Sequence, residues 1–196
     1  MTSIAGKLDT LLSALQEKGI DPAQNLNPGL SEQEIEDGER ELGFPFPAEL
    51  KQLYAWRNGN ADSGAEVEEM LCFRDMPFLS IEDALDCREE LKEFAAAYES
   101  SGLSLPFDPR KAFPFAALEG QYYVVACGDH EFADAGERPV IAAGEDLAPY
   151  FCSVQTMLDT CIAWVKDPEY TAETLEPEDE MQAWTRFNPG LMDEDV

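Results

Sequence analysis

The sequence predicts an α+β fold, with a mixed but mainly antiparallel sheet packed against several helices. The first reason is that apolar residues recur at helical spacing in four segments, each starting at or just after a serine that can cap it: 3–18, 31–42, 81–99 and 153–166. The second reason is a change of period near residue 112. There, two runs rich in aromatic and β-branched residues flank Glu119-Gly120 and predict a β-hairpin.

The N-terminal helix is predicted over residues 3–18. Ser3 can accept a hydrogen bond from the first turn, and Gly19 ends the helix because it tolerates a left-handed backbone. Its apolar residues fall on one stripe that faces a core: Ile4, Leu8, Leu11, Leu12 and Leu15. The following stretch, 21–29, is rich in turn residues and is predicted to be irregular.

Two shorter helices are predicted next, over residues 31–42 and 47–56. Ser31 and Glu34 form a capping box, in which each side chain accepts the backbone N–H of the other residue. Pro47 suits the first position of the second helix, because its missing N–H has no partner there. Asn58-Gly59 is predicted to end that helix, since both residues tolerate positive φ.

The remaining elements are predicted from the polarity of each stretch and from the spacing of its apolar residues. The polar stretch 60–69 is predicted to be a loop. The second arm of the hairpin has a long apolar run and is therefore expected to be a central strand, covered on both faces. The expected strands and helices of this part are 69–74, 81–99, 113–118, 121–127, 139–143, a strand or turn at 145–151, 153–166 and a short helix at 177–187.

The chain has 196 residues and no linker rich in Gly and Ser or in Pro, so we expect one domain with additions at both ends. The additions are a helix within 1–27 and an acidic extension at 167–196. The core lies between them, at 28–166. We expect the acidic extension to pack on the same domain.

Net charge is the most unusual property of the composition. Asp and Glu number 41 against 13 Lys and Arg, which gives a net charge of −28. Such a surface repels nucleic acid and anionic membranes and attracts cationic partners. Charge alone fits a solubilising shell equally well. The acids are spread over the 31–41 helix, the 62–69 loop and the 167–196 extension.

The cysteines and the N-terminus predict a cytoplasmic protein. The five cysteines include no CxxC pair, and their odd number in a chain of this size argues against a disulfide framework. The first nineteen residues intersperse apolar residues with charges, unlike a signal peptide. No apolar run of about 18 residues is present, so no membrane span is predicted.

The sequence offers little support for a catalytic or metal-binding site. The only histidine, His130, lies in Cys127-Gly128-Asp129-His130-Glu131, and one histidine without a cysteine or histidine cluster makes a poor zinc set. Glu66, Glu68 and Glu69 lack the ordered spacing of an EF-hand. No phosphate-binding, dinucleotide, hydrolase or zinc-protease motif occurs. We therefore expect no enzyme, no cofactor, no metal and no small-molecule substrate, with a hydrolase or metal enzyme as the remaining alternative.

Tryptophans are the strongest candidates for partner anchors, because they dominate interface hot spots. Trp56 either packs in the core or meets a partner, and Trp184 either packs back onto the domain or meets a partner. The full set of partner-binding candidates is Trp56, Glu66, Glu68, Glu69, Asp129, Glu131 and Trp184.

The segment LSEQEIEDGERELGFPFPAELKQLYAWRNG, residues 30–59, resembles the N-terminal motif of the SUKH superfamily. This superfamily contains the fungal Smi/Knr-type cell-wall assembly regulators and many bacterial relatives. The matching positions are Glu39, Leu42, Gly43, Phe46, Pro47, Leu50, Tyr54, Asn58 and Gly59. The order of a hairpin, a further strand and a Ser-capped helix is also similar, so the resemblance extends over about 28–166.

The resemblance implies a SUKH-like α+β fold and a non-catalytic protein-binding module. Bacterial members look like immunity proteins that bind and neutralise cognate toxins, often nucleases, and fungal members look like regulatory scaffolds with several partners. Together with the acidity, it predicts a basic toxin domain as the partner. The leading helix, the 81–99 helix and the acidic extension depart from the family pattern, and such additions often carry specificity.

Overall fold

The computed structural model describes residues 3–61, 65–66, 69–102, 105–132, 138–144 and 147–191, except the side chain of Phe94. Its α-helices are α1 (Ile4–Glu17), α2 (Glu32–Leu42), α3 (Ala48–Trp56), α4 (Ile81–Ser100), α5 (Val154–Lys166) and α6 (Glu180–Phe187). Its strands are β1 (Leu26–Pro28), β2 (Arg57–Asn60), β3 (Cys72–Phe73), β4 (Met76–Pro77), β5 (Ala112–Leu118), β6 (Gln121–Ala126), β7 (Val140–Ala143) and β8 (Leu147–Phe151). The predicted α+β class is confirmed.

Serine side chains begin four of the helices, as the sequence predicts. Ser3, Ser31, Ser80 and Ser153 each accept a backbone N–H from the first turn of α1, α2, α4 and α5. The capping box of Ser31 and Glu34 is formed in both directions. These caps occupy donors that a helix leaves unsatisfied at its start, and this is why short polar side chains place helix starts so accurately.

Strands β5 to β8 form one antiparallel sheet in that order. β6 lies between β5 and β7, so the prediction of a central strand is confirmed. Its side chains alternate between two faces: Tyr123 and Val125 enter the larger core, and Tyr122, Val124 and Ala126 enter a smaller one. This alternation is the two-residue period of a strand, and both sets are apolar because both faces are covered.

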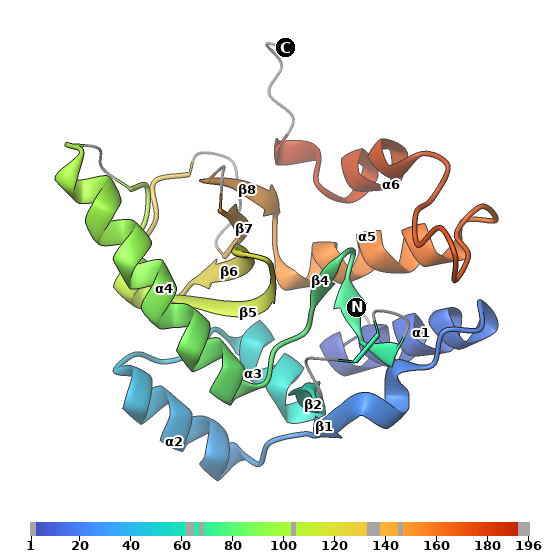
Figure 1. Ribbon diagram of the computed structural model, residues 1–196, viewed down its shortest axis with the longest axis horizontal. Coiled ribbons are helices and arrows are strands. Elements are labelled where there is room, and N and C mark those ends of the chain that lie inside the picture. Colours follow the sequence, from blue (N-terminus) through green and yellow to red (C-terminus); the bar gives the residue numbers. More distant parts are fainter. Residues whose placement is uncertain are drawn as a thin grey trace.

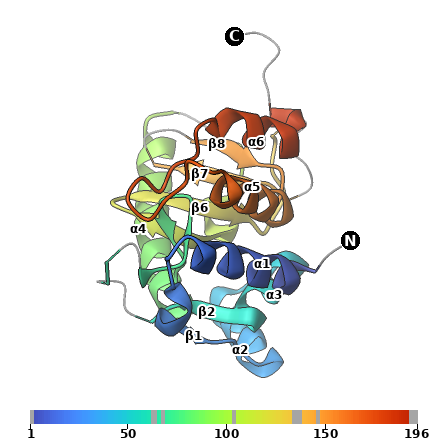
Figure 2. The ribbon, with the colours of Figure 1, turned by 90° about the vertical axis from the view of Figure 1, so that its right-hand side faces the viewer.

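Helices cover both faces of this sheet. On one face, Leu91 of α4 packs into the smaller core. On the other face, the larger core contains buried side chains of α1, α3 and α5, including Leu8, Leu53 and Leu158. Figure 1 shows α4 on one side of the sheet and α5 on the other. Figure 2 shows α6, α5 and α1 one above another.

The two predictions around β1 and β2 are wrong. Residues 26–28, expected within an irregular stretch, form β1 and pair with β2 in the antiparallel sense. Asn58-Gly59 does not cap α3, because the helix ends at Trp56 and the backbone at Arg57 is already extended. Both residues belong to β2. The strand partner, thirty residues away, leaves no mark in the local sequence around residue 58.

The predicted strand at 69–74 is shorter than expected. Only Cys72–Phe73 is extended, and it pairs with Met76–Pro77 across a two-residue turn at Arg74 and Asp75. In the predicted 60–69 loop, Asn60 instead belongs to β2, and residues 62–64, 67 and 68 lie outside the described residues. The remaining predicted strands appear as β5, β6, β7 and β8.

The two ends of the chain pack against the same helix. Leu8 and Leu11 of α1 and Trp184 of α6 join the core that includes Met157 and Leu158 of α5. Residues 192–196 lie outside the described part. None of the helices in the described ranges is long and apolar enough to cross a membrane.

Candidate functional site

Glu39 links α2 to the start of α3. Its carboxylate accepts the backbone N–H of Phe46 at 2.5 Å and the Lys51 ammonium at 2.8 Å. Gly43 ends α2 at φ 82° and donates its N–H to the Glu39 carbonyl. The left-handed glycine ends α2, and three residues later Phe46, which is 4% exposed, enters the core.

Asn58 and Asn60 fasten β2 to the segment that precedes α4. The Asn58 side chain accepts the backbone N–H of Ile81 at 2.8 Å, and the Asn60 side chain accepts the backbone N–H of Leu71 at 2.8 Å. Gly59 lies between them at φ 69°, and a Cβ there would come within 2.1 Å of the Ser80 nitrogen. Only glycine fits a position with this backbone angle and so little room.

The residues of the 30–59 motif therefore have structural contacts. Leu50 and Tyr54 are fully buried, and the Tyr54 hydroxyl donates to the Leu79 carbonyl at 3.2 Å. Leu42 is also buried, and Pro47 is the residue just before α3 rather than its first residue. The motif holds α2, α3 and β2 together and offers no exposed set of reactive groups.

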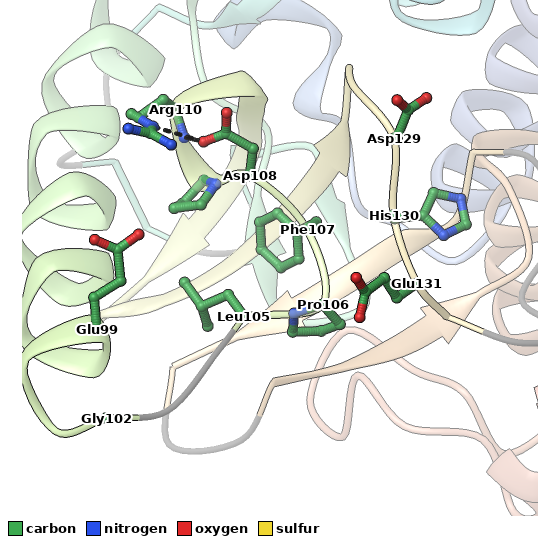
Figure 3. A pocket seen from close by; sticks show the side chains of 11 residues that line it. Glu99, Gly102, Leu105, Pro106, Phe107, Asp108, Arg110, Asp129, His130 and Glu131 are labelled. Carbon is green, nitrogen blue, oxygen red and sulfur yellow. Dashed lines mark hydrogen bonds and ion pairs between the residues drawn. The ribbon is translucent and has the colours of Figure 1, made fainter.

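An open pocket of about 640 Å³ lies at the C-terminal end of α4. We call it the acidic pocket. It is lined by Glu99 of α4, by the segment before β5 and by the segment after β6. Figure 3 shows Glu99, Asp108 and Arg110 on one side and Asp129, His130 and Glu131 on the other, with Pro106 and Phe107 between them.

Backbone hydrogen bonds hold the two walls of the acidic pocket in place. Phe107 and His130 form an isolated antiparallel bridge, and the Glu131 N–H donates to the Pro106 carbonyl at 2.6 Å. The Phe107 ring is buried and lies 6.1 Å from the Phe132 ring, centroid to centroid. These contacts hold the backbone of Asp129 and Glu131 in place, while their carboxylates are exposed to solvent.

The charge of the acidic pocket is negative. Among the described residues, four carboxylates line it, at Glu99, Asp108, Asp129 and Glu131, against one guanidinium, which gives a local charge of −3 with His130 counted as neutral. Arg110 Nε donates to Asp108 Oδ1 at 2.8 Å, and this hydrogen bond lowers the pKa of Asp108 below its ordinary value. Arg110 thus neutralises Asp108, and the other three carboxylates remain to attract a cation.

The described residues show no metal-binding cluster at the acidic pocket and no activated cysteine beside it. Within the described ranges, no group of three or more His, Cys, Asp and Glu side chains could hold a metal ion. Cys127 precedes the His130 loop, but burial raises the pKa of its thiol to about 12 and keeps it protonated. A protonated thiol is a poor nucleophile. The arrangement suits binding of a cationic group more than bond making.

The other partner-binding candidates lie elsewhere. Trp56 is half-buried, its Nε1 donates to Asp9 Oδ1 at 2.8 Å, and the Arg57 guanidinium carbon lies 5.4 Å from its ring centroid. Glu66 and Glu69 are exposed, and Glu68 lies outside the described residues. The structure brings Asp129 and Glu131 together with Glu99 and Asp108, which the sequence did not single out.

Trp184 is buried against the domain. Its Nε1 donates to the Tyr150 carbonyl at 2.7 Å, and 8% of the residue is exposed. Asn188, fully buried one turn later, accepts the Cys152 N–H at 3.0 Å and donates to the Thr160 hydroxyl at 3.2 Å. In this structure, α6 thus covers α5 and β8, and Trp184 is not available to a partner.

In the comparison with family models, the chain matches the SMI1 / KNR4 family (SUKH-1) over residues 29–159. The match spans α2 to the middle of α5, about two thirds of the chain. This chain belongs to the SMI1 / KNR4 family. No curated protein sequence matches it significantly.

Membership of the SMI1 / KNR4 family supports a non-catalytic protein-binding module, because the family includes immunity proteins and Smi1/Knr4 regulators. The 30–59 motif and every residue of the acidic pocket lie inside the matched segment. All of α1 and all of α6 lie outside it. The chain thus combines a family core that bears the acidic pocket with additions that cover α5.

Proposed function

We propose that this protein is an immunity protein, which binds and neutralises a basic toxin domain through the acidic pocket. The observation that carries the proposal is the local charge of −3 in a pocket of about 640 Å³ on a fixed backbone. Family membership supports the general class of binding module, and the net charge of −28 supports a cationic partner.

The pocket can bind a lysine or arginine side chain of the partner in two ways. Asp129 and Glu131 on one wall and Glu99 on the other offer carboxylates to its charged end, and Pro106 offers apolar surface to its aliphatic stem. One such contact forms only part of an interface, since stable complexes bury about 1,600 Å² in total. If the toxin is a nuclease, the basic residues bound here would be those that contact phosphates.

The wider acidic surface sets how fast the partner arrives. Exposed carboxylates on α2, such as Glu32 and Glu36, add to the field without lining the pocket. Long-range attraction of this kind raises association rates by about 10-fold to 1,000-fold at low salt. The charge of the whole chain therefore speeds encounter, and the pocket fixes where the partner binds.

The test is affinity capture from the native organism with three full-length baits, followed by mass spectrometry. The baits are the wild type, D129N/E131Q in the acidic pocket, and E32Q/E36Q on α2. Both variants change the net charge by +2, so only the position of the change differs. We expect one basic protein bound by the wild type and by E32Q/E36Q, with at least a tenfold loss for D129N/E131Q.

A second arm tests neutralisation. The captured protein is expressed alone and together with each bait, and growth is measured. Growth arrest that is relieved by the wild type and not by D129N/E131Q is expected. Capture of many unrelated proteins without a toxin would favour a regulatory scaffold. Turnover or stoichiometric metal in the purified protein would contradict a binding module.

A further inference from the structure

A second cavity, of about 200 Å³, lies on the far side of the sheet from α4, where α1 and α5 meet the segment 170–177 and the β3–β4 turn. We call it the apolar cavity. Eleven of its fifteen lining residues fall outside the family-matched segment 29–159. The cavity is therefore built mainly by the additions of this chain, and it does not depend on the proposed immunity function.

The floor of the apolar cavity is uncharged. Leu11 and Leu15 of α1 and Val165 of α5 contribute apolar carbon. Two thiols add to it, since burial raises the pKa of Cys72 and of Cys161 to about 12 and keeps both protonated. Neutral buried cysteines behave as small apolar side chains, so this floor favours an apolar ligand.

Trp164, Arg74 and Glu180, which line the apolar cavity, bind one another. Trp164 Nε1 donates to the Glu180 carbonyl at 2.9 Å, which satisfies the indole. Arg74 binds the Glu180 carboxylate with two contacts, Nε to Oε1 at 2.5 Å and Nη2 to Oε2 at 3.0 Å. The guanidinium also lies 5.8 Å from the Tyr150 ring centroid.

The charges around the rim exclude an anion. Arg74 is matched by Glu180, and the remaining two carboxylates, Asp75 and Glu176, leave a rim charge of −2. A ligand carboxylate would meet these like charges with its only cationic partner already engaged. A neutral or cationic polar group meets attraction instead.

Backbone strain is concentrated at the same place. Of the three non-glycine residues with positive φ in the described ranges, Arg74 (63°) and Leu175 (53°) both line the apolar cavity. Such conformations cost about 1–3 kcal/mol each and persist where the surrounding structure holds them, often at ligand sites. Two strained residues lining one cavity indicate that its shape is maintained.

We propose that the apolar cavity binds a small molecule whose apolar body is about the size of one aromatic ring and whose polar end is neutral or cationic. The volume sets the size, since an engineered apolar cavity of about 150 Å³ in another protein binds benzene. The uncharged floor favours an apolar body of the ligand, and the negative rim favours a polar end that is neutral or cationic.

The test uses the full-length ¹⁵N-labelled protein and three probes of matched size: benzylamine, benzyl alcohol and benzoate. The chain has three tryptophans, so the indole N–H signal of Trp164 can be assigned by comparison with a W164F sample. We expect benzylamine and benzyl alcohol to shift this signal with a Kd between about 0.1 and about 5 mM, the range open to ligands this small. Benzoate is expected to bind at least ten times more weakly.

Two cysteine variants provide matched controls. C161L adds two heavy atoms to the side chain that lines the apolar cavity and is expected to weaken benzylamine binding at least tenfold. C87L makes the same replacement on α4, where Cys87 is half-buried outside the cavity, and is expected to keep the wild-type Kd. The comparison of the three probes uses the wild-type protein and therefore does not depend on whether a variant folds. Absence of any Trp164 shift, benzoate binding as tight as benzylamine, or unchanged binding in a folded C161L would each overturn the proposal.

Discussion

Replacing Glu39 by alanine removes two contacts at once, the acceptor of the Phe46 N–H and the partner of the Lys51 ammonium. The backbone N–H of Phe46 would remain in a largely buried place without this acceptor. A hydrogen bond to a charged group contributes about 1.5–3 kcal/mol, and an orphaned buried donor costs a similar amount. The loss of the Phe46 contact should therefore dominate the effect.

The Lys51 contact adds little. The Lys51 side chain is 42% exposed and that of Glu39 is 15% exposed, so solvent screens the pair. Exposed pairs contribute at most about 1 kcal/mol, and here we take about 0.5 kcal/mol. The expected total for E39A is a loss of about 2–3 kcal/mol in the free energy of unfolding.

The measurement is urea denaturation followed by tryptophan fluorescence, at constant m-value. E39Q keeps an acceptor for the Phe46 N–H without the charge, and we expect it to lose about 1 kcal/mol. E36A, an exposed position one turn earlier on α2, is expected to stay within about 0.5 kcal/mol of the wild type. The reasoning fails if E39A is no less stable than E36A.

Three further predictions follow from single residues. Gly59→Ala should lower the stability in thermal melts by more than about 2 kcal/mol, because the backbone φ is 69° and a Cβ would lie 2.1 Å from the Ser80 nitrogen. Asn60→Ala should also lower the stability, because it removes the acceptor of the Leu71 N–H. An Asn60→Ala variant as stable as the wild type would contradict this role of Asn60. Burial raises the pKa of Glu49 above its ordinary 4.5, so stability from this group is full below pH 4.5 and falls as pH rises through the higher folded value; E49Q should flatten that fall in urea titrations. Burial raises the pKa of Cys72, Cys127 and Cys161 to about 12, so iodoacetamide at pH 8 should label them at least tenfold more slowly in the native protein than in urea, as read by mass spectrometry.

Local signals explain what the sequence could predict. The serine caps place the starts of α1, α2, α4 and α5, and the apolar run of β6 identifies a central strand, because each of these depends on neighbours along the chain. The pairing of β1 with β2 depends on residues thirty positions apart, and no local pattern records it. Asn58-Gly59 has the composition of a helix end, but its side-chain contacts with the residues before α4 make it part of a strand.

The candidate site was only partly predictable for the same reason. Asp129 and Glu131 are predicted binding candidates, as charged residues after a strand, and nothing in the sequence connects them to Glu99 or Asp108. The bridge between Phe107 and His130 makes that connection. The sequence of the acidic segment fits both a core role and a partner role for Trp184, and in the structure its Nε1 donates to the Tyr150 carbonyl.

The most direct test of the central claim is the salt dependence of association with the captured basic partner. Rates are measured by stopped flow for the wild type, D129N/E131Q and E32Q/E36Q from about 0.1 M to about 1 M NaCl, over which the screening length falls from about 10 Å to about 3 Å. We predict that the association rate falls steeply with salt for all three proteins, with dissociation accelerated only in D129N/E131Q. A rate that does not change with salt, or equal dissociation of the two variants, would contradict binding at the acidic pocket.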